Sequence, residues 1–219
     1  MLKIKKPVLQ VALDFIDMEE ALRVAQEVAR GGVDWLECGT PLIKAEGMRA
    51  IRLLRETFPN IPIVADLKTI DVGALEAKLA FSAGANIITV LALADNKTII
   101  DAVNVARSFG GYVMADLMNH PQPVSRAKEL EKMGVDIVLM HIGIDQQASS
   151  KFPLDQIPLI RKEIKSYLAV AGGLNDKTAP IAIKHGADII IVGRYITRAD
   201  NPTEATKKVK EAITKSLFT

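Results

Sequence analysis

The chain has 219 residues, of which 49% are hydrophobic, and its 28 Lys and Arg residues nearly balance its 26 Asp and Glu residues. The formal net charge of +2 gives no support for nucleic-acid binding through bulk electrostatics, although it allows a local cationic pocket for a phosphate. No apolar stretch approaches the roughly 18 residues of a membrane span, and no secretory signal is evident. Cys38 is the single cysteine of the sequence, so an internal disulfide is excluded. We therefore expect a cytoplasmic protein that binds neither membrane nor nucleic acid.

Short apolar segments alternate with amphipathic helical segments along the whole chain. The predicted strands span residues 8–14, 33–38, 61–66, 86–91, 111–116, 135–141, 167–171 and 188–192. The first helix is expected to begin at a capping box formed by Asp17 and Glu20 and to end at Gly31. Gly-Val or Gly-Ala pairs that start at positions 32, 84, 134 and 186 indicate helix ends leading into buried strands.

Eight strand–helix units predict an α/β protein, a single (β/α)8 barrel that forms one domain over residues 1–219. An open, doubly wound sheet is the alternative, because alternation alone does not establish closure. Such a sheet usually has fewer strands, and no Gly-x-Gly-x-x-Gly motif follows the first predicted strand. The barrel is therefore favoured, with an active site at the C-terminal ends of its strands.

Ionisable residues finish five of the predicted strands, at Asp14, Glu37, Asp66, Asp116 and His141. One such residue could be a helix cap, but five of them at the same rim indicate an active site. Glu37 and Asp66 come from adjacent strands and could offer carboxylate oxygens to Mg²⁺, with water and substrate completing the coordination. Zinc is disfavoured, because the three histidines show no ligand spacing and Cys38 stands alone.

The segment at residues 65–71, Ala-Asp-Leu-Lys-Thr-Ile-Asp, carries the most specific signal in the chain. Strand alternation would place Asp66 and Lys68 on the same side, where the third strand meets its loop. Opposite charges that leave a buried strand are costly unless they pair with each other, a metal or a substrate. Asp71 follows five residues after Asp66, where the next helix should begin. A surface ion pair followed by a helix cap is the alternative interpretation.

His141 is the only histidine placed at a strand end, before the glycine-containing loop at residues 142–147. A lone histidine is often structural, but this position favours a role in proton transfer. His120 falls in a proline-flanked loop, and His185 is expected at the C-terminus of a helix.

Glycines follow the last two predicted strands, at Gly172, Gly173 and Gly193, and Arg194 comes next. Glycines at these strands let backbone N–H groups approach a phosphate, and an arginine adds a cationic fork. A simple tight turn at Gly172 and Gly173 is the alternative. Two glycine sites on neighbouring strands favour phosphate binding.

The pattern resembles the orotidine 5′-monophosphate decarboxylase suprafamily, whose hallmark Asp-x-Lys-x-x-Asp is matched by Asp66, Lys68 and Asp71. Within that group the chain is most similar to the 3-hexulose-6-phosphate synthase family, through residues 9–14, 37–41, 65–73, 141–147, 171–173 and 192–194. The resemblance implies a Mg²⁺-dependent aldol reaction that joins formaldehyde to D-ribulose 5-phosphate, a phosphosugar, or the reverse reaction. It also implies a homodimer with shared active sites, in which Asp71 reaches the partner's lysine.

The candidate residues fit this chemistry. Mg²⁺ held by Glu37 and Asp66 would stabilise an enediolate, and Lys68 would supply a second positive charge. His141 would transfer the proton, and Asp14 would orient Lys68 or a substrate hydroxyl. Gly172, Gly173, Gly193 and Arg194 would hold the phosphate far from the reacting carbon.

Three alternatives are distinguished by particular positions. The pattern of the orotidine 5′-phosphate decarboxylases has a lysine on the second strand, where this chain has Glu37. It also has a Pro-Gly-Ile-Arg-like phosphate loop, which this sequence lacks. The pattern of the 3-keto-L-gulonate 6-phosphate decarboxylases has an arginine at the position where this chain has Ile144. A phosphosugar-binding regulator would leave Asp66, Lys68 and His141 without a chemical purpose.

Overall fold

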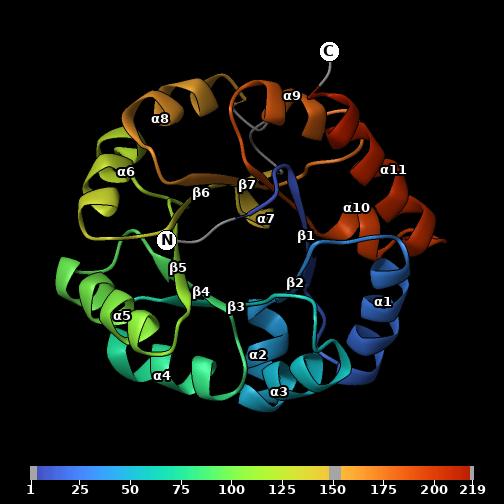
Figure 1. Ribbon diagram of the computed structural model, residues 1–219, viewed down its shortest axis with the longest axis horizontal. Helices are drawn as coiled ribbons and strands as arrows, with labels where there is room; N and C mark the ends of the chain where they lie inside the picture. The colour runs from blue at the N-terminus through green and yellow to red at the C-terminus, as the bar shows by residue number, and fades with distance from the viewer. Residues whose placement is uncertain (1–3, 148–153, 218–219) are drawn as a thin grey trace.

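The computed structural model describes residues 4–147 and 154–217. In these residues eight parallel strands close into a barrel in chain order, from β1 to β8, and β8 pairs back with β1 (Figure 1). The strands are β1 (Val8–Leu13), β2 (Trp35–Cys38), β3 (Ile63–Thr69), β4 (Ile87–Leu91), β5 (Tyr112–Asp116), β6 (Ile137–His141), β7 (Tyr167–Ala171) and β8 (Ile189–Val192).

Helices surround the barrel (Figure 1). They are α1 (Met18–Arg30), α2 (Thr40–Glu46), α3 (Met48–Thr57), α4 (Gly73–Ser82), α5 (Asn96–Ser108), α6 (Pro123–Lys132), α7 (Ile144–Gln147), the 3₁₀ helix η1 (Leu154–Gln156), α8 (Ile157–Glu163), α9 (Ala179–Lys184), α10 (Arg194–Thr197) and α11 (Pro202–Lys215). No helix of the described residues is long and apolar enough to cross a membrane.

The predicted barrel is confirmed, and closure excludes the open sheet. Seven strands agree with their predicted bounds to within two residues, and β3 is the exception because it continues to Thr69. The expected cap of α1 is present, since the Asp17 carboxylate accepts the Glu20 N–H at 2.8 Å, and Gly31 ends this helix.

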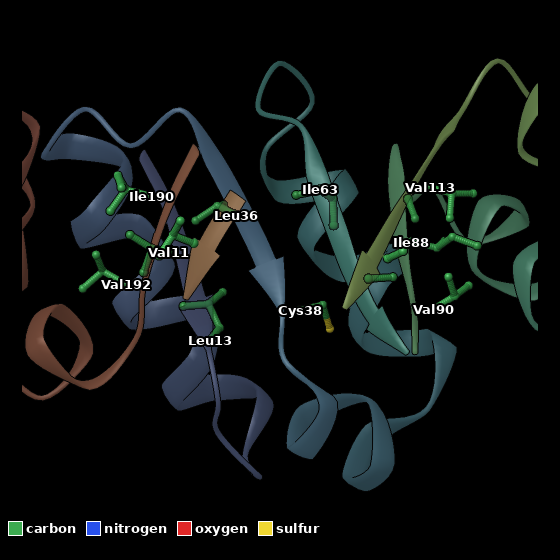
Figure 2. Close-up of a cluster of buried hydrophobic side chains, with 14 of the residues drawn as sticks. Val11, Leu13, Leu36, Cys38, Ile63, Ile88, Val90, Val113, Ile190 and Val192 are labelled. Carbon is green, nitrogen blue, oxygen red and sulfur yellow. The ribbon is translucent and has the colours of Figure 1, made fainter. Parts of the chain in front are cut away.

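Alternation along each strand separates two apolar layers. On β1, Leu9, Val11 and Leu13 pack against the helices, whereas Val8 and Ala12 join the cluster inside the barrel. Figure 2 shows part of the outer layer, with side chains from β1, β2, β3, β4, β5 and β8. The inner cluster contains Trp35, Val64, Met114 and other residues from every strand. Each strand is therefore buried on both faces, as parallel sheets require.

The N-terminal end of the barrel repeats one arrangement four times. Before β2, β4, β6 and β8, a glycine with positive φ lies two residues ahead of an Asp or Asn; these glycines are Gly32, Gly84, Gly134 and Gly186. The four acidic or amide side chains are Asp34, Asn86, Asp136 and Asp188, and they accept the backbone N–H groups of Leu9, Ile63, Val113 and Leu168 at 2.7, 2.9, 3.0 and 2.9 Å. The predicted helix ends at these glycines are confirmed, and the repeat ties successive strand pairs together.

A cation from a preceding helix completes each copy of this arrangement. Arg55 of α3 donates to Asn86, Arg107 of α5 to Asp136 and Arg161 of α8 to Asp188. Lys210 of α11 does the same for Asp34, which closes the cycle across the two ends of the chain. The barrel thus has a fourfold pattern of strand anchors at its N-terminal end.

Candidate active site

A cavity of about 440 Å³ opens at the C-terminal ends of the strands. Nine of the predicted site residues line it: Asp14, Glu37, Asp66, Lys68, His141, Gly172, Gly173, Gly193 and Arg194. Ile144, which stands where the decarboxylase pattern has arginine, lines it as well. The structure therefore brings the predicted carboxylate, lysine, histidine and glycine positions into one pocket, and Asp71 is the predicted site residue outside its lining.

Lys68 and Asp66 form an ion pair at the end of β3. Asp66 is 4% exposed, and its carboxylate also accepts hydrogen bonds from the hydroxyls of Thr40 and Thr89, each at 2.8 Å. Burial acts to raise the pKa of Asp66, but the Lys68 charge and these hydrogen bonds lower it below its ordinary value. Asp66 is consequently held as a carboxylate in a fixed orientation.

The backbone of Lys68 departs from a regular strand. The β3–β4 register shifts between Ala65 and Thr69, and Lys68 has a φ of 49°. Its N–H donates to the Thr89 hydroxyl at 2.9 Å. The prediction that Asp66 and Lys68 lie together is confirmed, but the regular alternation on which it was based is wrong. A bulge aims the lysine, as bulges beside active sites commonly do.

The Lys68 ammonium is a fixed positive charge. Burial acts to lower its pKa, whereas Asp66, followed by Asp116 and Glu37, raises the pKa above its ordinary value. Lys68 therefore stays protonated across the neutral range. It can stabilise a developing negative charge but is poorly suited to act as a base.

Glu37 and Asp14 add two more carboxyl groups to the same end of the pocket. Glu37 is 7% exposed, and burial, the Asp66 charge and then the Asp14 charge raise its pKa well above its ordinary value. Enclosure in the pocket and Asp66 also raise the pKa of Asp14. A Cβ atom at Gly39 would lie 2.2 Å from an Asp14 carboxylate oxygen, so only glycine leaves room for this side chain.

This crowding of carboxylates fits a divalent cation. The Asp66 charge raises the pKa of both Glu37 and Asp14, and Asp14 raises that of Glu37 further, beside a single lysine; a bound cation would relieve that repulsion. In the described part of the chain, no group of three or more His, Cys, Asp or Glu side chains is arranged to hold a metal ion. A site built on Glu37 and Asp66 would therefore need water and substrate oxygens, which is how proteins usually bind Mg²⁺.

Asp116 orients His141. The Asp116 side chain is fully buried, one of its oxygens lies 2.8 Å from His141 Nδ1, and the other accepts the Met118 N–H at 2.9 Å. A carboxylate only accepts hydrogen bonds, so the neutral imidazole carries its hydrogen on Nδ1. The Nε2 atom is then unprotonated and able to take a proton from a substrate in the pocket.

The opposite end of the pocket is made largely of backbone. Gly172 and Gly173 have φ values of 118° and 67°, and a Cβ atom at Gly172 would lie 2.5 Å from the Ile142 carbonyl oxygen. Glycine is therefore required there, and the exposed backbone suits close approach of a phosphate. Arg194, which is exposed, donates to Gln147 at 3.2 Å.

Asp71 lies outside the pocket of its own barrel. It is exposed, and its carboxylate accepts the N–H of Val72, the residue at the N-cap position of α4. This location agrees with the expectation that Asp71 cannot reach its own candidate metal ligands. Whether it serves a neighbouring subunit stays a prediction.

Sequence reasoning missed the residues that hold the predicted ones in place. Thr40 and Gln147 lie in segments that carry the family resemblance but were given no role, Thr89 was not identified, and Asp116 was found at a strand end without its pairing to His141. Thr89 could have been predicted from strand alternation, since it lies on the inward face of β4, next to the charged residues of β3.

Comparison with known proteins places the chain in a family. The sequence model described as "Orotidine 5'-phosphate decarboxylase / HUMPS family" matches residues 7–209. This chain belongs to that family. It is 38% identical to the 3-hexulose-6-phosphate synthase of Bacillus subtilis (strain 168), covering 94% of this chain and 98% of the relative. It is 40% identical to that of Mycobacterium gastri, covering 94% and 99%.

A solved structure agrees with these relatives. The structure of 3-hexulose-6-phosphate synthase from Salmonella typhimurium superposes with a TM-score of 0.92 at 34% identity, covering 95% of this chain and 99% of that one. The resemblance inferred from the motifs is therefore confirmed at the level of the family.

Proposed function

We propose that the chain is a 3-hexulose-6-phosphate synthase, which joins formaldehyde to D-ribulose 5-phosphate or catalyses the reverse cleavage. The observation that carries this assignment is the single pocket in which the Lys68–Asp66 pair, Glu37 and the Asp116–His141 pair face the glycine loops of β7 and β8. The identity to synthases over nearly the whole chain supports the same reaction. The carbon–carbon lyase chemistry requires proton removal at one end and phosphate binding at the other.

The residues divide the reaction between them. His141 Nε2 takes a proton from C1 of ribulose 5-phosphate, and the electron pair left behind forms an enediolate. Lys68 stabilises the negative charge, and C1 then bonds to the formaldehyde carbon while the formaldehyde oxygen takes up a proton, which balances the one that His141 removed from C1. Gly172, Gly173, Gly193 and Arg194 hold the phosphate, which fixes the distance between C1 and His141.

Mg²⁺ is the proposed cofactor, held by Glu37 and Asp66. When bound, it supplies a positive charge to the oxygens of the enediolate. The support for it is the excess of carboxylates over cations at this end of the pocket. Cys38 is a buried free thiol, which fits the reducing cytoplasm that we propose as the location of the enzyme.

One assay separates the synthase from its alternatives. Formaldehyde release from 3-hexulose 6-phosphate should require Mg²⁺ and stop with EDTA. Decarboxylation of 3-keto-L-gulonate 6-phosphate should be much slower, because Ile144 replaces the arginine of the decarboxylase pattern, and orotidine 5′-phosphate should not react. Faster decarboxylation than formaldehyde release would overturn the assignment, and binding of all three compounds without turnover would support a regulator.

We also propose a homodimer in which Asp71 completes the partner's site. Large exposed apolar side chains lie near Asp71 in the chain: Ile70 and Val72 flank it, and Leu75 and Leu79 follow on α4, with exposures of 52%, 53%, 57% and 48%. Such a patch around an exposed carboxylate is typical of a covered interface. A twofold axis would make the donation of Asp71 reciprocal.

Mixed dimers test the shared site. Asp71→Ala and Lys68→Ala should each be inactive, but a heterodimer of the two contains one intact site if Asp71 crosses the interface. Tandem-tagged, purified heterodimers should then recover up to about half of the activity of a wild-type dimer. Verified heterodimers that stay inactive would contradict the shared site without affecting the reaction assignment.

A further inference from the structure

Gln10 is a buried polar side chain inside the barrel that the proposed reaction does not use. It lies on the inward face of β1, between Val8 and Ala12, and is paired in register with Trp35 on β2 and Ile191 on β8. Its side chain is fully buried. A polar side chain in this apolar layer is costly unless its hydrogen-bonding groups are satisfied.

Only half of the Gln10 amide has a protein partner in the described residues. Its Nε2 donates to Glu37 Oε2 at 2.5 Å, and its Oε1 is the one buried side-chain atom there that has no hydrogen-bond partner. When Glu37 is ionised, as a cation ligand has to be, exchanging the amide oxygen and nitrogen would place two acceptors against each other, so the amide donor faces the Glu37 carboxylate. The fold therefore keeps an unsatisfied acceptor in order to present an N–H group to this carboxylate.

A merely structural role would favour an apolar residue at this position. The neighbouring inward residues of the same layer are apolar, and an apolar side chain of similar volume would leave no unsatisfied atom. Positions where a fold keeps an unfavourable group are commonly functional. The benefit of Gln10 has to lie in what it does to Glu37.

We propose that Gln10 is a positioning residue that fixes the Glu37 carboxylate for binding a divalent cation. By donating to Oε2 of Glu37, Gln10 restricts the rotation of this carboxylate and leaves Oε1 for a cation in the pocket that Glu37 lines. Outer hydrogen-bond partners of metal-binding carboxylates orient them and commonly change metal affinity by about 10- to 100-fold. This inference depends on the proposed Mg²⁺ site.

The test replaces Gln10 with methionine, which has a similar volume and no hydrogen-bonding amide. Mg²⁺ affinity is measured by calorimetry on the full chain with ribulose 5-phosphate present and formaldehyde absent, and Mn²⁺ binding by electron paramagnetic resonance serves as a second readout. Gln10→Met should weaken the binding of both cations by about 10-fold or more. Met114→Leu, a volume-conserving change in the same inner cluster, should leave both affinities within twofold of the wild type.

Stability of the metal-free protein separates positioning from structure. Urea unfolding of Gln10→Met in EDTA should have a midpoint close to that of the wild type, because the lost bond to Glu37 is offset by removal of the unsatisfied oxygen. Unchanged cation affinity would overturn the proposal. So would failure of both Gln10→Met and Gln10→Leu to fold, or a large loss of metal-free stability in both, because Gln10 would then be structural.

Two further outcomes distinguish this inference from the proposed function. If wild-type protein binds Mg²⁺ and Glu37→Gln weakens that binding while Gln10→Met does not, only the role of Gln10 is wrong. If wild-type protein with ribulose 5-phosphate binds neither Mg²⁺ nor Mn²⁺, the metal site itself fails and the inference fails with it.

Discussion

The two ends of the barrel are built in opposite ways. At the N-terminal end, one arrangement of glycine, acidic or amide acceptor, backbone N–H and helix cation occurs four times. At the C-terminal end, the polar residues at or near the strand ends differ from one strand to the next, with Asp66 and Lys68 in the last part of β3, Asp116 at the end of β5 and His141 at the end of β6. Repetition thus marks the end that holds strands together, and variety marks the end that carries chemistry.

Charge is also treated differently at the two ends. Asp34, Asp136 and Asp188 each have a cation and a backbone donor. By contrast, Glu37 and Asp14 lie close enough to Asp66 that its charge raises the pKa of both, beside a single lysine. Satisfied acceptors stabilise the fold, whereas crowded carboxylates destabilise the pocket until a ligand binds. Stability and function are therefore expected to respond to different substitutions.

The largest effect is expected from Glu37→Gln. An amide removes one negative charge from the proposed cation site, and kcat/KM should fall by about 10³-fold, the scale of a lost charge-stabilising group. The pKa of Glu37 is raised in the folded protein, so above its ordinary pKa the ionised group lowers stability. At pH 8 without metal, Glu37→Gln should therefore unfold at the same or a higher urea concentration.

A matched surface change sharpens this prediction. Glu163→Gln removes a carboxylate that pairs with Lys128 at 3.0 Å, and it should alter neither kcat/KM nor the urea midpoint measurably. Glu37→Gln protein with wild-type turnover would exclude Glu37 from the reaction.

Asp188→Ala should give the next largest effect, but on stability. Asp188 is 7% exposed and accepts from Lys6 at 2.5 Å, Arg161 at 3.0 Å and the Leu168 N–H at 2.9 Å. Its loss leaves two cations and a backbone donor without this acceptor, which should lower the free energy of unfolding by about 3 kcal/mol. Turnover at 25 °C should stay within twofold. A loss of kcat above tenfold in folded protein would show that the two ends are not independent.

His141→Asn should slow proton exchange by about 10²-fold while stability is kept. The measurement is NMR of C1 deuterium incorporation from D₂O into ribulose 5-phosphate, with phosphosugar affinity followed separately. Asp116→Asn should have a smaller effect in the same direction, because it alters the orientation and tautomer of His141 and leaves the imidazole present. Exchange at the wild-type rate in His141→Asn would assign this proton to another group.

The same contrast explains what could be predicted from the sequence. The strands and the pocket carboxylates followed from periodicity and strand ends, because a parallel strand is apolar until it reaches the rim. Closure was favoured only by the number of strand–helix units and the absence of a dinucleotide-binding glycine motif. The bulge at Lys68 could not be predicted, since it depends on the Thr89 hydroxyl of the next strand. Thr40, Gln147 and the pairing of Asp116 with His141 were missed for the same reason. These contacts link residues of different strands and loops, and no local pattern encodes them.

The smallest effect is expected at the weakest of the four anchors, the pair of Lys210 and Asp34. Their side chains are 28% and 32% exposed, whereas Asp188 is buried in the equivalent position before β8. Water can replace Lys210, and Asp34 would keep the Leu9 N–H at 2.7 Å, so Lys210→Ala should cost about 0.5–1 kcal/mol of unfolding free energy.

Arg161→Ala provides the comparison within the repeat. Arg161 also donates to the Ile164 and Ser166 carbonyl oxygens at 2.5 and 2.8 Å, so its loss should cost more than that of Lys210. Urea unfolding at low and high NaCl measures both, and salt should reduce the Lys210 effect more because that pair is exposed. Equal losses of unfolding free energy at the two positions would mean that the contribution of an anchor does not depend on its burial. Closure of β8 onto β1 would then depend on Lys210 as strongly as on the buried pairs.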